Sequence, residues 1–217
     1  MNMDSYHMLD EHYLRYADAT IAYNASLRSR IGTSPPQSNV SPDLEHLGEL
    51  EREAADHYRA ELGSKLLAEQ VAIQLPFATR ARCFVRLRFL MHAAVLCDPS
   101  SKLSEALCTV LSELLISYSN YPAWIWSVPR DYALDECLYA MWGHPLSDEQ
   151  LSPLLRRMLT SEALVDDSAL IVSAHYKALR LLKKIASPAA LSTIEFARTH
   201  AIPDVATLAD ILSSERE

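Results

Sequence analysis

Carboxylate and imidazole side chains at helical spacing are the residues of this sequence best suited to chemistry. Glu49, Glu53 and His57 recur at intervals of four residues, which places them on one face of a helix. Helical bundles build di-iron and di-manganese sites from such groups, but they need further Glu-x-x-His motifs from other helices. The C-terminal half supplies none, and the acid-rich surroundings are typical of a solvated face. We therefore expect no metal or other cofactor, with a helical metallo-enzyme using these three residues as the alternative.

The short motifs of nucleotide and hydrolase chemistry are missing. The four glycines are spread singly, so neither a P-loop nor a G-x-G-x-x-G can be written, and no H-E-x-x-H or G-x-S-x-G occurs. The four cysteines form no C-x-x-C pair, which is typical of buried reduced thiols. A thiol nucleophile could be assembled only from distant residues, with nothing local in support: Cys83 or Cys137 with His92 or His175. These absences favour a protein that is not an enzyme.

An aromatic cluster covers residues 118–142, which hold all three tryptophans and four of the ten tyrosines. Its first part, residues 118–129, contains two prolines and predicts a loop between helical hairpins. Trp and Tyr dominate interface hot spots, so we predict a partner-binding surface here. The alternative is that these rings fill a gap between irregular hairpins. The aromatic residues assigned to the surface are Tyr118, Tyr121, Trp124, Trp126 and Tyr132.

Two groups of basic residues could orient a partner. The first follows the acidic stretch 43–69 and either meets an acidic partner or pairs with that stretch: Arg80, Arg82, Arg86 and Arg88. The second shares one helical face, where cations also suit the negative end of the helix dipole: Lys177, Arg180 and Lys184. Charged faces govern the orientation and rate of association. We include Arg80, Arg82 and Arg86 in the predicted partner-binding surface.

The elements that must position these residues are predicted to be helices throughout. Apolar residues recur at intervals of three and four, and strand signals are nearly absent. Residues 1–29 predict an amphipathic helix that lies on the body or, alternatively, forms a homodimer through its tyrosine seam. Residues 30–41, rich in Pro and Ser, predict a linker, and residues 42–217 predict the helical body. The seam contains Tyr6, Tyr13, Tyr16 and Tyr23.

A proline corner recurs along the body. Pro99, Pro145 and Pro188 are 46 and 43 residues apart, and an apolar-faced helix is predicted on either side of each. Proline stops the preceding helix and starts the next one. The last unit, ALRLLKKIASPAALSTIEFARTHAIPD (178–204), resembles a HEAT-type repeat, and weaker copies extend the resemblance over residues 79–214. It implies a short α-solenoid of about three stacked hairpins whose faces dock a partner. An irregular helical bundle is the alternative all-α fold.

Charge and hydropathy limit the kinds of partner that the protein is expected to bind. The net charge of −8 disfavours nucleic acid and anionic membranes. No apolar run is long enough to span a bilayer, and the N-terminus lacks the pattern of a signal peptide, so we expect a cytoplasmic protein. The sequence therefore predicts an acidic, protein-binding module such as an adaptor, inhibitor or immunity-type protein. A helical homodimer with only a structural role is a further alternative.

Overall fold

The computed structural model describes residues 60, 68–80, 84–120, 123–165 and 168–215. Within these ranges the chain is helical and contains no strand, which confirms the predicted all-α class. Residues 68–80 are helical and precede the labelled elements. These are α3 (Phe84–Val95), α4 (Ser101–Asn120), α5 (Ala123–Met141), α6 (Asp148–Leu159), a 3-10 turn η1 (Glu162–Leu164), α7 (Ala169–Ile185), α8 (Pro188–Ala197) and α9 (Pro203–Ser214). The predicted N-terminal helix and linker lie outside the described residues.

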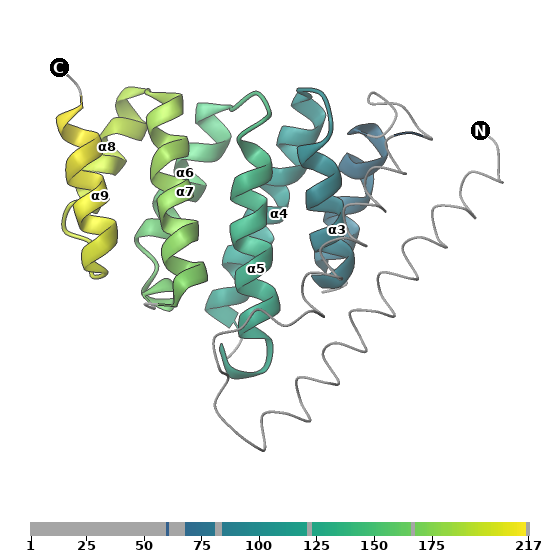
Figure 1. The fold of residues 1–217 in the computed structure, drawn as a ribbon, viewed down its shortest axis with the longest axis horizontal. Coiled ribbons are helices and arrows are strands. Elements are labelled where there is room, and N and C mark those ends of the chain that lie inside the picture. The colour runs from purple at the N-terminus through teal and green to yellow at the C-terminus, as the bar shows by residue number, and fades with distance from the viewer. Residues whose placement is uncertain (1–59, 61–67, 81–83, 121–122, 166–167, 216–217) are drawn as a thin grey trace.

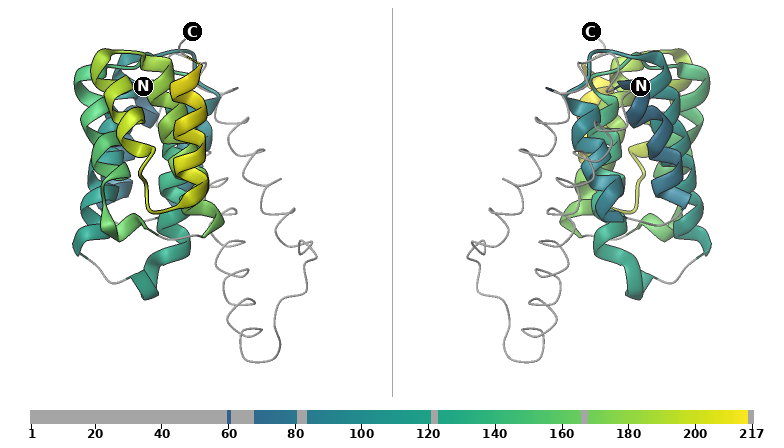
Figure 2. Two further views of the ribbon diagram at one scale, coloured as in Figure 1. Left: turned by 90° about the vertical axis from the view of Figure 1, so that its left-hand side faces the viewer. Right: turned by 90° about the vertical axis from the view of Figure 1, so that its right-hand side faces the viewer.

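The labelled helices stack in two layers. In the first layer α5 lies between α3 and α7, and α7 also contacts α9; in the second, α6 lies between α4 and α8. The first layer faces the viewer in Figure 1, and the end-on views of Figure 2 show the two layers side by side. Large side chains with almost no exposed surface, such as Leu107, Leu134 and Leu138, come from both layers. Each layer therefore covers the apolar face of the other, which is what holds helical hairpins together.

The predicted proline corners separate consecutive helices. The corners at Pro99, Pro145 and Pro188 join α3 to α4, α5 to α6 and α7 to α8. At the last corner, the Ser187 hydroxyl accepts a hydrogen bond from the Ala190 amide at 3.0 Å, and Pro188 occupies the first turn of α8. Serine at the N-cap followed by proline is a standard helix start. Local chemistry thus sets where these helices begin.

The predicted loop at residues 118–129 is wrong. α4 continues to Asn120, α5 begins at Ala123, and Pro129 lies inside α5. A proline within a helix removes one backbone hydrogen bond, which was the reason for expecting a loop. However, α5 packs against α3, α4 and α7, and the helix continues through Pro129. The aromatic stretch is therefore presented mainly by helices.

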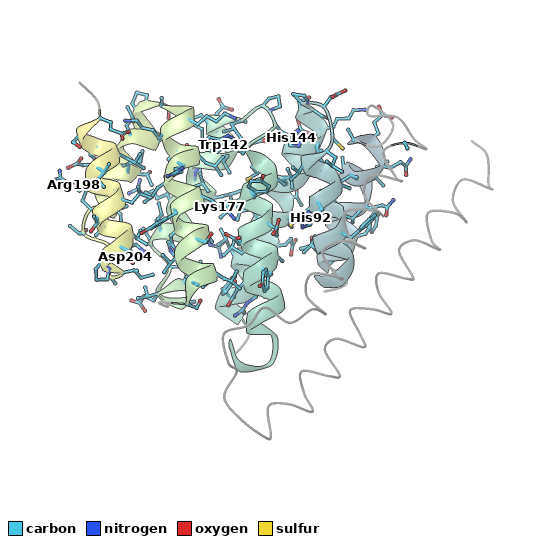
Figure 3. All side chains as sticks on the ribbon, viewed as in Figure 1. His92, Trp142, His144, Lys177, Arg198 and Asp204 are labelled. Carbon is cyan, nitrogen blue, oxygen red and sulfur yellow. The ribbon has the colours of Figure 1, made fainter. Side chains whose placement is uncertain are left out.

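The corner between α5 and α6 is bonded to its neighbours. His144 is 3% exposed, and the Ser100 amide donates to its Nδ1 at 3.3 Å. Because Nδ1 accepts, the ring proton lies on Nε2, which donates to the Ala94 carbonyl at 3.1 Å. Lys184 of α7 donates to the Trp142 carbonyl at 2.5 Å. These bonds fix the corner, and Trp142 with it, near the upper end of the first layer (Figure 3).

Ion pairs and hydrogen bonds join the last helix, α9, to the helices before it. Arg198 at the end of α8 pairs with Glu195 at 2.5 Å and with Asp210 of α9 at 2.7 Å. Lys183 of α7 donates to the Leu212 carbonyl near the end of α9 at 2.8 Å. These contacts therefore join α9 to α7 and to the end of α8.

Candidate protein-binding surface

Helices α5 and α7 are joined by paired side chains that set their direction and register. Lys177 Nζ lies 2.6 Å from Asp135 Oδ2, and Lys184 Nζ contacts the Trp142 carbonyl. Both pairs link residues that are 42 apart in the chain. The equal offset means that the two helices run parallel and in register. Positions on α5 and α7 can therefore be matched directly.

Two aromatic rings of α5 lie beside two ammonium groups of α7. Lys177 Nζ is 5.4 Å from the ring centroid of Tyr139, and Lys184 Nζ is 5.1 Å from that of Trp142. Both distances are within the range of cation–π attraction, about 6 Å. Tyr139 remains 52% exposed and Trp142 47% exposed. We call this region the α5–α7 surface, made of Tyr139, Trp142, Lys177, Arg180 and Lys184.

The α5–α7 surface has an excess of positive charge. Asp135 neutralises Lys177, with the carboxylate side chain 10% exposed and the ammonium side chain 29% exposed. Arg180 and Lys184 are exposed, and within the described part of the chain no carboxylate pairs with either of them. The whole protein has a net charge of −8, so this patch is opposite in sign to the molecule that carries it. In Figure 3, Lys177 and Trp142 lie on the side of the first layer that faces the viewer.

Tyr118, a member of the predicted partner-binding surface, lies in the interior instead. It is 7% exposed, and its hydroxyl donates to Asp131 Oδ1 at 2.5 Å. The guanidinium carbon of Arg130 lies 3.7 Å from its ring centroid. Burial, and then the Asp131 carboxylate, raise the pKa of Tyr118, so that its hydroxyl stays protonated. For this ring the alternative interpretation, a side chain filling space between helices, describes the structure.

The structure describes some of the other predicted site residues in full, some only by their helix, and some not at all. Two are described in full: Tyr132, half-buried on α5, and Arg80, exposed at the end of the helical residues 68–80. For three, the helix is described and the side chain is not: Trp124 and Trp126 in α5, and Arg86 in α3. The rest lie outside the described residues: Tyr121, Arg82, the seam tyrosines Tyr6, Tyr13, Tyr16 and Tyr23, and the alternative metal ligands Glu49, Glu53 and His57.

Two described residues of the possible thiol nucleophile, Cys137 and His175, each contact a backbone carbonyl instead of each other. The Cys137 thiol contacts the Leu107 carbonyl at 3.5 Å, and burial raises its pKa well above the ordinary value. A thiol in this state is a poor nucleophile. His175 donates from Nδ1 to the Ile171 carbonyl, one turn earlier on its own helix, at 2.8 Å. Over the described ranges, no three His, Cys, Asp or Glu side chains gather in a way that could hold a metal ion.

The sequence analysis singled out the aromatic and the basic residues of the α5–α7 surface, but it did not predict that they lie next to each other. Tyr139 and Trp142 belong to the aromatic stretch, and Lys177, Arg180 and Lys184 share the predicted basic face. The available signal was the spacing of the proline corners, 46 and 43 residues, which is close to the offset of 42 between paired positions. Helices one such period apart become neighbours in the stack.

The fold and the surface define a class: an all-α protein of two stacked helical layers with a basic, aromatic face. Comparison with protein-family models, with curated proteins and with solved structures finds no match for this chain. The HEAT-type resemblance therefore stays a prediction. Among the helices that the structure describes, none has the length and apolar character required to cross a membrane.

Proposed function

We propose that this protein is a non-enzymatic binding module, of the adaptor, inhibitor or immunity type, that docks another protein on its α5–α7 surface. The observation that carries the proposal is the pair of half-exposed aromatic rings, Tyr139 and Trp142, set among the cations of α7. Buried Trp, Tyr and Arg side chains supply most of the binding energy in protein interfaces. The three types occur together here.

Preorganisation of this surface supports the proposal. Both helices belong to the packed first layer, and the corner that bears Trp142 is tied to α7 through Lys184. A surface that is already ordered loses little conformational entropy when a partner binds, so more of the contact energy becomes affinity. The chemistry of the described interior favours binding over catalysis, because its thiols are buried and Asp135 is paired with Lys177.

A cytoplasmic location is part of this proposal. The described cysteines Cys97, Cys108 and Cys137 are buried. Thiols of this kind are ordinary in reducing compartments, whereas secreted proteins of similar size more often carry disulfides. We also propose that neither nucleic acid nor membrane is the partner, and the net charge of −8 supports this.

The test compares partner capture by matched variants. The Tyr139→Ala/Trp142→Ala double variant should lose most of the proteins recovered by affinity purification from the source cells, with far-UV circular dichroism unchanged. Phe196→Ala is the control, because Phe196 is 50% exposed at the far end of the stack, on α8. Equal recovery by the wild type and the double variant would contradict the proposal.

The metallo-enzyme alternative has its own test. Its residues, Glu49, Glu53 and His57, lie outside the described part of the chain. Elemental analysis of protein purified from its source decides the matter, since a stoichiometric amount of iron, manganese or zinc would replace the binding proposal with a metal site.

A further inference from the structure

We infer that the partner segment held by the α5–α7 surface is acidic: its carboxylates pair with Arg180 and Lys184, and an apolar side chain next to them lies on Trp142. Since it names the chemistry of the partner at that same surface, this inference rests on the proposed function. It goes further in choosing one kind of occupant from those that an aromatic surface could accept.

The charges of α7 carry the first step. Lys177 is committed to Asp135, with the two charged atoms 2.6 Å apart. Among the described residues, the Lys184 ammonium contacts neutral groups, the carbonyl and the ring of Trp142, and the exposed Arg180 pairs with no carboxylate. Within the described ranges, two cations on one stretch of helix thus have no counter-charge. Residues four apart on a helix lie about 6 Å from each other, a spacing that two carboxylates of one peptide can match.

The aromatic rings carry the second step. About half of Tyr139 and of Trp142 is open to solvent, although each has an ammonium group on one side. A purely ionic ligand would leave these rings uncovered. An apolar side chain beside the acidic residues covers them and removes water from the ion pairs, which strengthens the pairs. The surface therefore fits a mixed acidic and apolar segment.

The distribution of charge separates a short acidic peptide from larger polyanions. The protein has a net charge of −8, so nucleic acid or an anionic membrane meets repulsion from most of the molecule. At physiological salt the Debye length is about 8 Å, so a short segment feels mainly the local cations. A local positive patch on an acidic protein therefore selects a ligand of similarly small size.

The experiment uses a labelled peptide and matched charge reversals. The probe is a fluorescein-labelled helical peptide of Ala, Glu and Leu, with Glu every fourth residue and Leu before each Glu, and its partner probe has Gln in place of Glu. Binding to the full chain is followed by fluorescence anisotropy. The variants are Arg180→Glu on the surface and Arg157→Glu on α6 in the other layer, where Arg157 is also exposed. Both substitutions change the net charge equally, and circular dichroism checks their helicity.

We expect the Glu peptide to bind about tenfold more tightly than the Gln peptide. Arg180→Glu should weaken binding by about tenfold and Arg157→Glu by less than about twofold, and added salt should weaken binding to the wild type. The inference is overturned if the Glu peptide does not bind, if it binds no better than the Gln peptide, or if both variants behave alike. It is also overturned if a single-stranded oligonucleotide or phosphatidylserine vesicles bind the wild type more tightly than the Glu peptide does, and Arg180→Glu weakens that binding.

Capture of the natural partner separates failure of the inference from failure of the function. If Trp142→Ala removes the captured protein and Arg180→Glu does not, the surface binds a partner whose segment is not acidic. If neither substitution changes capture, the proposed function itself is wrong. If both remove it, the function and the inference are supported together.

Discussion

Replacing His175 with leucine should make this protein less sensitive to acid. His175 lies in the middle of α7 with 0% of its surface exposed. Its Nδ1 donates to the Ile171 carbonyl at 2.8 Å, and its Nε2 is buried with no hydrogen-bond partner among the described residues. Burial lowers the pKa of His175 to about 4; the Ile171 carbonyl opposes this, and His200, with ring centroids 4.8 Å apart, adds to it. The ring is therefore neutral in the folded protein at neutral pH.

The sign of the pH effect follows from this lowered pKa. The unfolded chain binds a proton at His175 below about pH 6.5, whereas the folded protein does so only below about pH 4. Above the first value neither state is protonated, and His175 has no effect on stability. Between the two values only the unfolded state gains the proton, so the free energy of unfolding falls as the pH falls. The slope is about 1.4 kcal/mol per pH unit, which gives a loss of about 2 kcal/mol at pH 5.

Leucine removes the titration and keeps the packing. It is apolar and of similar size, and the Ile171 carbonyl retains its hydrogen bond within the helix backbone. His175→Leu should therefore be at least as stable as the wild type near neutral pH. Between about pH 7.5 and about pH 5 it should lose about 2 kcal/mol less than the wild type does.

Urea unfolding followed by far-UV circular dichroism measures this difference. Phe196→Ala is the control, because Phe196 is 50% exposed and carries no titratable group, so the pH dependence should stay close to that of the wild type. If the free energy of unfolding of His175→Leu depends on pH in parallel with that of the wild type, the buried neutral histidine is not the source of acid sensitivity and the reasoning fails.

Three further predictions concern packing. Lys177→Met, which leaves the buried Asp135 carboxylate unpaired, should lower the free energy of unfolding by about 2 kcal/mol. Adding Asp135→Leu should recover most of that loss. A urea titration in which the double variant is as unstable as the single one would contradict this. Tyr118→Phe, which removes the donor to a buried carboxylate, should cost about 1–3 kcal/mol, and an unchanged melting temperature would argue against that hydrogen bond. Ala186→Gly should raise the free energy of unfolding by about 0.5–1 kcal/mol, because Ala186 has φ 55°, a conformation that favours glycine. Ala189→Gly, within α8, should lower it by a similar amount. Equal shifts in the melting temperature of the two variants would exclude the backbone explanation.

The prediction at residues 118–129 failed because a local signal met long-range packing. Proline punctuates a chain through its own ring and its missing amide hydrogen, so Pro99, Pro145 and Pro188 mark real corners between helices. Pro129 has the same chemistry but lies inside α5, a helix that packs against three others. In a single sequence all four prolines look like helix breakers, and the sequence contains no measure of that packing.

The composition of the α5–α7 surface was readable, and its assembly was not. Helical periodicity places Lys177, Arg180 and Lys184 on one face, since that depends only on neighbours within two turns. The approach of Lys184 to Trp142 depends on which helix becomes the neighbour of α7, and the two residues are 42 apart in the chain. The burial of Tyr118 and the exposure of Tyr139 likewise separate two rings that look equivalent in the sequence.

The sequence by itself determined the all-helical class and the three proline corners, because both depend on interactions between residues a few positions apart. Tertiary structure alone decided which helices lie side by side, and thereby which cations meet which rings and which histidine is sealed from water. The physical reason is that burial and electrostatic pairing are properties of the space between elements, and that space exists only once the layers have packed.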